Sequence, residues 1–373
     1  MKKIVINALA YKQNSSGIGV MIRELFEPYT QDTHRTCQVL LPNDGPPFHG
    51  GDQTETVRIP YKHGENLRRM WFQTFQFGRK YCRDSVLLTT DSKTPFFLPH
   101  TCKLIPLVTD LAVYRMPEAY QPSRVLWWKS QYAYVRRRAK LFLAISESTK
   151  RDMMELFHIP EEKIRVVPCA CPSEIQPVRD AEKLDALRRK YDLPGHFLLF
   201  VGNSNPRKNL ERTMRAFDRA KELSGIPHQL IIAGEQGWKF DREKAFKNIR
   251  HKADIRFIGF VPDEDMPALY SAADLFVFPT LYEGFGIPVL EAQTCGTPVV
   301  TSNCTSLPEV GGDAAVYVAP CDPEDICRGI LKVLKDPVLA SELVKKGYEN
   351  AARFSWEKSA RRLHEIVEEV MDA

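Results

Sequence analysis

Residues 275–326 read LFVFPTLYEGFGIPVLEAQTCGTPVVTSNCTSLPEVGGDAAVYVAPCDPEDI, and this stretch decides the fold. Its apolar run Leu275–Phe278 is typical of a buried strand, and the glycine-rich turn Gly284-Phe-Gly286 follows it. The turn leads into a short helix with Pro288 in its first turn, where proline is well tolerated. A second apolar run follows the helix. Because a strand, a helix and another strand succeed one another, the stretch predicts a parallel β-α-β unit.

The same alternation of short apolar runs and helical spacing continues along the 373 residues. The expected strands are the runs 3–9, 39–41, 86–89, 104–108, 141–145, 164–167, 197–202, 229–233, 255–258, 275–278, 298–301 and 315–318. The predicted fold class is therefore α/β, with parallel sheets covered by helices on both faces.

The pattern restarts near residue 197, which indicates two Rossmann-like doubly wound domains in tandem. We expect an N-terminal domain over 1–172, a C-terminal domain over 173–355, and a last helix over 356–373 that packs back toward the N-terminal domain. Ligands of such sheets bind beyond the carboxyl ends of the strands, so two domains facing one another would form a cleft.

The composition, 43% hydrophobic and 27% charged residues, is typical of a globular protein. No apolar run approaches the ~18 residues of a membrane span, and the N-terminus predicts a first strand rather than a signal peptide. The nine cysteines have no paired metal-binding spacing and indicate reduced thiols. We therefore expect a cytoplasmic protein.

The glycine-rich turn of the opening stretch has the features of an anion site. Glycines before a helix expose backbone N–H groups, and the helix dipole adds partial positive charge, which suits a phosphate. Glu283 precedes the turn and Glu291 lies eight residues later in the helix. Carboxylates would repel a phosphate, so we expect them to accept hydrogen bonds from hydroxyl groups on either side, as a sugar offers.

The two glutamates, EGFGIPVLEA, and the following CGTPVV and SLPEVGGDAA closely resemble the retaining glycosyltransferases of family 4, which have the two-domain GT-B fold. This resemblance implies transfer of a sugar from a nucleotide-sugar donor without a metal. It implies that Glu283 holds the donor sugar and Glu291 the ribose hydroxyls. The amides of Phe285, Gly286 and Ile287 would contact sugar and phosphate.

A basic pair, Arg207 and Lys208, lies between an expected strand and an expected helix. Two cations at this place can hold a diphosphate. The family has its phosphate-binding basic residues in this region, and many members have arginine directly after the strand's glycine. Asn203 stands there in this sequence, so that contact is absent or supplied by Arg207. A surface ion pair is the alternative.

Two segments of the N-terminal half also resemble the family. Gly17-Ile-Gly19 opens a helix, and its family counterpart reaches the donor phosphates or the acceptor; a tight turn without a ligand is the alternative. Asp110 follows an expected strand, but Thr109 stands where related enzymes have histidine. Asp110 therefore either orients the acceptor hydroxyl or caps the next segment.

Asp263-Glu-Asp265 has the form of a metal-binding motif of another glycosyltransferase fold. It begins an expected helix, where acidic residues are favoured by capping and by the helix dipole. We therefore expect no metal and no cofactor, since the nucleotide-sugar is a substrate.

The charge is uneven: residues 1–180 hold 26 Lys and Arg against 18 Asp and Glu, although the whole chain is only +5. The stretches 62–83 and 124–151 combine basic and aromatic residues. They suit an anionic membrane surface, a single-stranded nucleic acid, or a helix with an aromatic core face and a solvated basic face. The family favours the first, because many members use lipid-diphosphate acceptors, so we expect peripheral contact with the inner face of the membrane and no nucleic acid.

The form GFGIP, with PRKN and TDLA, looks most like the mannosyltransferase branch, which points to GDP-mannose as the donor and to polysaccharide biosynthesis. The acceptor would be a glycan or a lipid-linked saccharide. The alternatives are a UDP-sugar donor, a nucleotide-sugar 2-epimerase and a non-catalytic nucleic-acid-binding protein. The candidate catalytic residues are Glu283, Asp110, Arg207 and Lys208. The candidate donor-binding residues are Gly17, Gly19, Arg207, Lys208, Glu283, Gly284, Phe285, Gly286, Ile287 and Glu291.

Overall fold

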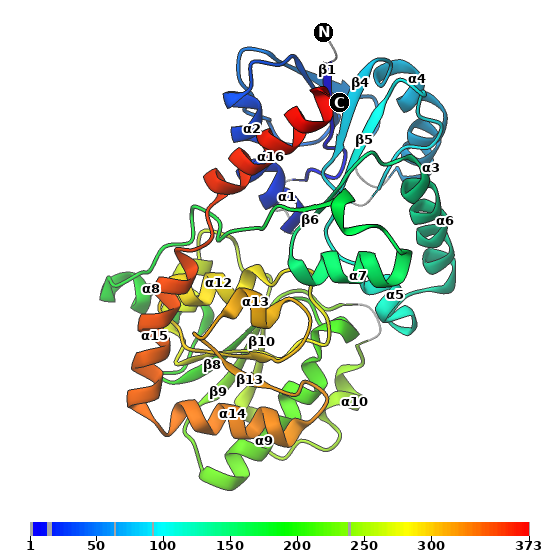
Figure 1. Cartoon of the computed structure of the whole chain (residues 1–373). Coiled ribbons are helices and arrows are strands. Elements are labelled where there is room, and N and C mark those ends of the chain that lie inside the picture. Colours follow the sequence, from blue (N-terminus) through cyan, green and yellow to red (C-terminus); the bar gives the residue numbers. More distant parts are fainter. Residues whose placement is uncertain (1–2, 13–16, 63–64, 92, 238–239, 373) are drawn as a thin grey trace. The chain divides into compact units, whose positions relative to one another are not determined.

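The computed structural model describes residues 3–12, 17–62, 65–91, 93–237 and 240–372. The chain forms two compact units, one made of residues 1–169 together with 355–373 and the other of residues 170–354. Each unit contains a parallel sheet with helices around it (Figure 1). We refer to them as the N-terminal and the C-terminal unit.

The N-terminal unit contains, in its described part, a sheet of seven parallel strands in the order β3-β2-β1-β4-β5-β6-β7. The strands are β1 (Lys3–Asn7), β2 (Cys37–Pro42), β3 (Thr54–Ile59), β4 (Ser85–Thr89), β5 (Lys103–Val108), β6 (Phe142–Ala144) and β7 (Ile164–Val166). The helices are α1 (Gly17–Met21), η1 (Ile22–Phe26), α2 (Glu27–Asp32), α3 (Asn66–Trp71), η2 (Phe72–Gln76), α4 (Phe77–Tyr81), α5 (Ala112–Arg115), η3 (Pro117–Ala119), α6 (Pro122–Arg138), α7 (Glu147–Phe157), η4 (Glu161–Lys163) and α16 (Trp356–Asp372).

Among the strands that the structure describes in this unit, the edge strand β3 is the one that the apolar runs did not predict. Its sequence TETVRI leaves several side chains exposed, and it pairs with a neighbouring strand on one side only. The central strands β1 and β4, by contrast, are almost wholly buried and carry the continuous apolar runs typical of parallel sheets.

The helix α16 belongs to the N-terminal unit although it ends the described chain. Arg35 forms a paired salt bridge with Glu368, with an Nη2–Oε2 distance of 2.5 Å, and the Tyr29 and His364 rings lie 4.3 Å apart. The Lys103 ammonium donates to the carbonyl of Val370 at 2.7 Å. These contacts join α16 to α2, to the turn after α2 and to β5. In Figure 1, α16 lies beside α2.

The C-terminal unit contains, over its described residues, a sheet of six parallel strands in the order β10-β9-β8-β11-β12-β13. The strands are β8 (Phe197–Val201), β9 (Gln229–Ala233), β10 (Ile255–Gly259), β11 (Leu275–Phe278), β12 (Val299–Ser302) and β13 (Val316–Val318). The helices are α8 (Ala181–Tyr191), η5 (Pro206–Lys208), α9 (Leu210–Ser224), α10 (Arg242–Phe246), η6 (Lys252–Asp254), α11 (Met266–Ala272), α12 (Ile287–Thr294), α13 (Leu307–Gly311), α14 (Pro323–Leu334) and α15 (Pro337–Ala351).

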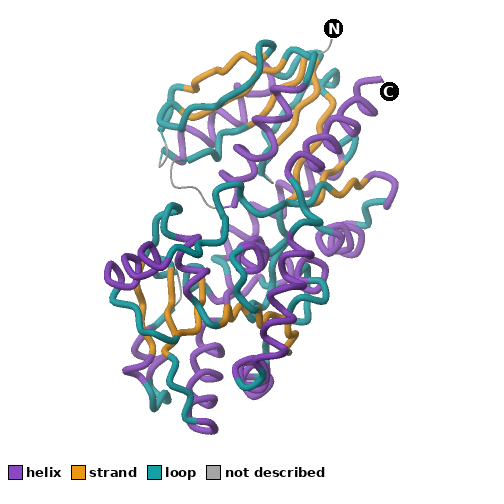
Figure 2. The backbone as a smooth tube through the Cα atoms, turned by 90° about the vertical axis from the view of Figure 1, so that its left-hand side faces the viewer, coloured by secondary structure: helices purple, strands orange, loops and turns teal. Residues whose placement is uncertain are grey.

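Helices lie on both faces of this sheet (Figure 2). On one face α9 and α14 bury apolar side chains, among them Phe217 and Ile330, against β8, β9 and β11. On the other face α11 and α12 pack together, and α12 contacts β11 and β12. In the described part of the chain, no helix combines the length and the apolar character that crossing a membrane would need.

Candidate functional site

The side chains predicted to hold a nucleotide-sugar gather at the carboxyl edge of the C-terminal sheet. Arg207 and Lys208 follow β8, and Glu283 follows the neighbouring strand β11. The carboxyl ends of adjacent parallel strands meet at one edge of a sheet, which is where such sheets bind ligands. The strand order therefore brings together residues that are 75 positions apart in the sequence.

Glu283, Arg207 and Lys208 form a buried charged cluster, which we call the charge triad. The Glu283 carboxylate lies 2.7 Å from Arg207 Nη1 and 2.9 Å from Lys208 Nζ, and Glu283 is only 7% exposed. Burial raises the pKa of Glu283, but the charges and hydrogen bonds of both cations outweigh burial and bring that pKa below its ordinary value. Glu283 is therefore ionised, and the triad has an excess of one positive charge, which suits an anionic ligand.

The loop that carries the basic pair is fastened to its neighbours by Asn209. This residue has φ of +61°, a left-handed conformation that asparagine tolerates better than most residues. Its side-chain amide donates to the carbonyl oxygens of Pro279 at 2.8 Å and of Pro320 at 2.7 Å. The Leu281 amide also donates to the carbonyl of Arg207 at 2.9 Å. The cations are thus held on a fixed backbone rather than on a loose surface loop.

The glycine-rich turn after β11 ends in Gly286, which precedes α12. Gly286 has φ of +111°, and a Cβ atom there would lie 2.7 Å from Leu307 Cδ2, so only glycine fits. The amide groups of Phe285, Gly286 and Ile287 have no hydrogen-bond acceptor within the part of the chain that the structure describes. This is the arrangement of backbone donors that binds anions at the start of a helix.

The second glutamate, Glu291, lies one turn inside α12 and has a different environment. The Tyr270 hydroxyl on α11 donates to Glu291 Oε2 at 2.6 Å. Burial raises the pKa of Glu291 to about 7, against the opposing effect of the Tyr270 hydrogen bond. Glu291 therefore changes its charge near neutral pH, whereas Glu283 stays ionised.

The remaining candidates lie in the N-terminal unit. Gly17 and Gly19 are in the first turn of α1, with Gly17 exposed and Gly19 buried. Asp110 Oδ1 accepts a hydrogen bond from the Ala112 amide at 3.0 Å, so this carboxylate caps the short helix α5. Capping was one of the two roles expected for Asp110, and it leaves the second carboxylate oxygen for another partner.

Three supporting residues of the site were missed by the sequence analysis. Asn209 ties down the basic loop, Tyr270 holds Glu291, and the Ser306 hydroxyl reaches the carbonyl oxygens of Glu283 at 3.0 Å and Phe285 at 2.6 Å. Asn209 had a signal, because asparagine before a helix is a turn residue. Tyr270 and Ser306 had none, since their partners come from other elements.

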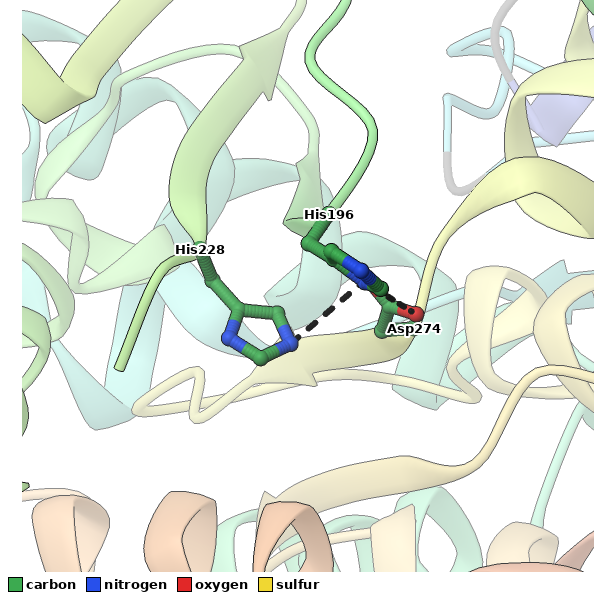
Figure 3. Close-up of side chains that lie close together, drawn as sticks. All are labelled: His196, His228 and Asp274. Atoms are coloured by element: carbon green, nitrogen blue, oxygen red, sulfur yellow. Dashed lines mark hydrogen bonds and ion pairs between the residues drawn. The ribbon is translucent and has the colours of Figure 1, made fainter.

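The structure also bears on where a metal ion could bind. Asp265, of the Asp-x-Asp motif, is engaged by Lys190 Nζ at 2.7 Å and by the Tyr191 hydroxyl at 2.5 Å. Among the described residues, one group has the right kinds of ligand atoms within 4.8 Å of one another: His196, His228 and Asp274 (Figure 3).

That histidine-aspartate group lies at the amino ends of β8, β9 and β11, the sheet edge opposite the charge triad. Asp274 Oδ2 lies 3.3 Å from His196 Nδ1 and 3.6 Å from His228 Nε2. The same oxygen accepts from the Phe197 amide at 2.9 Å, which joins the starts of β8 and β11. A metal bound there would not contact the charge triad.

Both halves of the chain match families of known proteins. Residues 185–351 match the family "Glycosyl transferases group 1", and residues 15–174 match "Glycosyltransferase Family 4". "O-antigen chain mannosyltransferase B" of Escherichia coli is 36% identical over 265 residues, which are 70% of this chain and 69% of that protein. "Serotype-specific mannosyltransferase WbdA" of Escherichia coli is 33% identical over 60% of this chain, which spans only 28% of that longer protein.

A solved structure supports the architecture. Sucrose-phosphate synthase from Thermosynechococcus elongatus superimposes with a TM-score of 0.73 and 19% identity, covering 100% of both chains. At this identity the likeness concerns the fold alone. It confirms the predicted fold class, GT-B with two Rossmann-like parallel-sheet domains.

Proposed function

The chain belongs to the family 4 glycosyltransferases, and from this premise we propose that it transfers mannose from GDP-mannose to a saccharide acceptor with retention of the anomeric configuration. Mannose is favoured because two relatives, 36% and 33% identical, have mannosyltransferase in their names. The O-antigen name of one relative supports a role in polysaccharide biosynthesis, with a glycan or a lipid-linked saccharide as acceptor.

The main observation in support of this proposal is the charge triad, together with the backbone amides at the start of α12. A diphosphate leaving group accumulates negative charge as the glycosidic bond breaks, and fixed cations and backbone amides stabilise that charge. A guanidinium has five N–H donors and an ammonium three, so Arg207 and Lys208 can hold a diphosphate and Glu283 together. Glu283 would then accept hydrogen bonds from the donor sugar next to the reacting carbon.

We infer retention from the likeness to family 4, and the described ion pairs of Glu283 are with two cations, Arg207 and Lys208. Without an enzymatic nucleophile opposite the leaving group, we propose that the acceptor hydroxyl attacks from the same face as the departing diphosphate. Glu291 would bind the ribose hydroxyls. Asp110 would orient the acceptor hydroxyl through the oxygen that does not cap α5, and Gly17 and Gly19 would contact the donor phosphates.

The donor is tested by the thermal unfolding of the purified protein with a panel of nucleotides and nucleotide-sugars. A ligand stabilises by about RT ln(1 + [L]/Kd), so the preferred base gives the largest increase in Tm. We expect GDP and GDP-mannose to exceed UDP and UDP-glucose. A larger effect of UDP would favour the UDP-sugar alternative. Incubation with the donor alone, followed by analysis of the sugar, separates transfer from 2-epimerisation.

The raised pKa of Glu291 predicts a pH-dependent donor KM. Below pH 7 this carboxyl is increasingly protonated and loses acceptor capacity for ribose hydroxyls. The donor KM should therefore rise as the pH falls from 8 to 6, by up to about 10-fold if only the ionised form binds. The control is Glu291→Gln, whose donor KM should be high and should change little between pH 8 and pH 6. If the donor KM of this variant still rose as the pH fell, Glu291 would not be the origin of the pH dependence.

We also expect transfer to continue in EDTA, because Arg207, Lys208 and the amides at the start of α12 supply the electrostatic stabilisation that a divalent metal supplies elsewhere. His228→Gln serves as the control, since it removes a ligand of the histidine-aspartate group without touching the charge triad. Its rate should equal that of the unchanged protein with and without chelator. Loss of transfer in EDTA that Mg²⁺ or Mn²⁺ restores would overturn the metal-independent mechanism.

Peripheral contact with anionic membranes is part of the proposal. Two arginines are available to a membrane surface: the side chain of Arg68 is 73% exposed, and Arg137 is exposed on α6. Arg138, by contrast, donates a hydrogen bond to the carbonyl of Pro99 at 2.8 Å and so stabilises the fold. Flotation should recover more protein with anionic than with neutral vesicles, and less at high salt. The variant with Arg68→Gln and Arg137→Gln should float less. Equal recovery with both kinds of vesicle would contradict membrane contact through these charges.

A further inference from the structure

The histidine-aspartate group is positioned by the backbone of three adjacent strands (Figure 3). His196, His228 and Asp274 directly precede the first residues of β8, β9 and β11, which are neighbours in the order β9-β8-β11. The Gln229 amide donates to the His196 carbonyl at 3.2 Å. The Asp274 amide donates to the Phe197 carbonyl at 3.0 Å. The three side chains therefore start from fixed strand ends, which hold ligands more precisely than loops do.

The distances within the group suit a small divalent cation. In a tetrahedral zinc site with bonds of 2.0–2.1 Å to nitrogen and oxygen, the ligand atoms lie about 3.3 Å apart. Asp274 Oδ2 lies 3.3 Å from His196 Nδ1 and 3.6 Å from His228 Nε2. One ligand atom from each of the three residues lies within 4.8 Å of the other two. Small rotations of the side chains are enough to bring all three atoms onto one ion.

Direct contacts leave the Asp274 carboxylate weakly held. Its distances to the two imidazoles exceed the 2.7–2.9 Å of a charge-assisted hydrogen bond. The nearest ammonium group belongs to another pair: Lys221 Nζ lies 2.8 Å from Asp254 Oδ2 and donates to the His228 carbonyl at 3.1 Å. Lys221 thus fixes the backbone of His228, and its charge is balanced by Asp254. The charge of Asp274 is left to the imidazoles or to a cation between them.

The kinds of ligand atom favour zinc. Magnesium and calcium prefer sets of oxygen ligands, whereas two imidazoles with one carboxylate suit zinc. Burial lowers the pKa of His228, with further lowering by His196 and Lys221 and an opposing effect of Asp274. His228 is therefore neutral at pH 7, which is the form that binds metals. The His196 side chain is 63% exposed, so a fourth ligand can approach from solvent.

We propose that His196 Nδ1, His228 Nε2 and Asp274 Oδ2 bind a zinc ion, with water as the fourth ligand. The ion joins the starts of β8, β9 and β11 and stabilises the C-terminal unit. It lies at the sheet edge opposite the charge triad, so it takes no part in the transfer reaction and is compatible with a metal-independent mechanism. Zinc binding at this edge does not depend on the proposed function.

The probe is zinc sulfate, titrated by calorimetry into the full chain after treatment with EDTA and removal of the chelator. We expect one zinc ion to bind per chain. With free zinc at about 100 times its Kd, the Tm should rise by about 5 °C, because a ligand that binds only the folded state stabilises it. Magnesium sulfate at the same concentration should leave the Tm unchanged.

Two glutamine variants test the ligands. His228→Gln removes the buried ligand, and His196→Gln removes the exposed one, whose replacement leaves the core intact. Each should weaken zinc binding by at least about 10-fold, the smallest loss usual when even an indirect partner of a metal is removed. The matched control is His100→Gln, an exposed histidine of the N-terminal unit, which should bind zinc normally.

A third variant, His196→Cys, gives a positive signal. Cobalt replaces zinc in such sites, and a thiolate bound to cobalt adds an intense charge-transfer band in the near ultraviolet. The unchanged protein should give the visible spectrum of four-coordinate cobalt without this band, because its ligands are nitrogen and oxygen. His196→Cys should gain the band, which requires that the side chain at this position bind the metal.

Each contrary outcome overturns the proposal. An unchanged Tm with zinc would show that the three side chains serve only as direct contacts between strand starts, and an equal rise with magnesium would show no selection by imidazole. Normal zinc binding by both glutamine variants would place the metal elsewhere. A thiolate band in the unchanged protein would assign the metal to cysteines, of which Cys321 is exposed. Transfer in EDTA tests the proposed mechanism separately, so the two failures are distinguishable.

Discussion

Lys208→Met should reduce the turnover number for the proposed mannose transfer by about 10²- to 10³-fold, the usual loss when a fixed group that stabilises transition-state charge is removed. Methionine retains much of the lysine stem, so contact with the Phe278 ring, now 4.6 Å from the ammonium, is largely kept. The ammonium group itself is lost from the proposed site of the leaving diphosphate. Glu283 then keeps only Arg207 as a cationic partner, so the pKa of Glu283 should rise. Initial rates at saturating donor measure the effect.

The matched control for Lys208→Met is Lys332→Met, which changes an exposed lysine of α14 in the same unit. It should leave both turnover and GDP binding unchanged. A Lys208→Met protein that is folded, binds GDP normally and turns over at the normal rate would show that this cation has no part in the departure of the diphosphate.

Glu283→Gln should lower turnover by about 10- to 150-fold, the equivalent of a lost hydrogen bond to a charged group. In the proposed site, the contact of Glu283 with the donor sugar tightens as the bond breaks, so the change should affect kcat more than the donor KM. The substitution also leaves Arg207 and Lys208 buried without a counter-charge, and breaking a buried ion pair costs about 3–5 kcal/mol of unfolding free energy. GDP, which brings negative charge to the two cations, should restore more stability to this variant than to the unchanged protein.

Glu291→Gln provides the comparison for Glu283→Gln, because ribose does not change during transfer and its contact is nearly uniform binding. It should mainly raise the donor KM and weaken GDP binding. If Glu283→Gln lost GDP binding while Glu291→Gln kept it, the two roles would be reversed. If neither variant changed turnover or KM, this pair of glutamates would have no part in transfer.

The fold could be predicted from the sequence wherever strands are buried on both faces. The stretch around β11 and β12 has continuous apolar runs and a glycine-rich turn, and the observed bounds of both strands lie within a residue or so of the expected ones. The edge strand β3 has no such run, because half of its side chains are exposed. The π-helical segments η1 and η2 also have no signal in the pattern of apolar residues, since their neighbouring turns are ordinary α-helix.

The site could be predicted only as far as local motifs reach. The sequence indicated that Glu283 precedes a helix and that Arg207 and Lys208 follow a strand, but their ion pairs join residues 76 and 75 positions apart. Such contacts depend on strand order, which the apolar pattern does not determine. The difference in pKa between Glu283 and Glu291 likewise depends on which neighbours the fold supplies, two cations for one and a tyrosine hydroxyl for the other.

The position of α16 has a consequence for biosynthesis. The N-terminal unit includes residues 355–373, so a ribosome must translate the whole of residues 170–354 before the last helix of that unit emerges. Until then the surface that α16 covers, including Tyr29 and Arg35, remains uncovered. Domains usually fold in the order of their synthesis, but here the C-terminal unit can complete its fold first. The N-terminal unit would wait in an incomplete state, which is when a nascent chain is most exposed to aggregation and to chaperones.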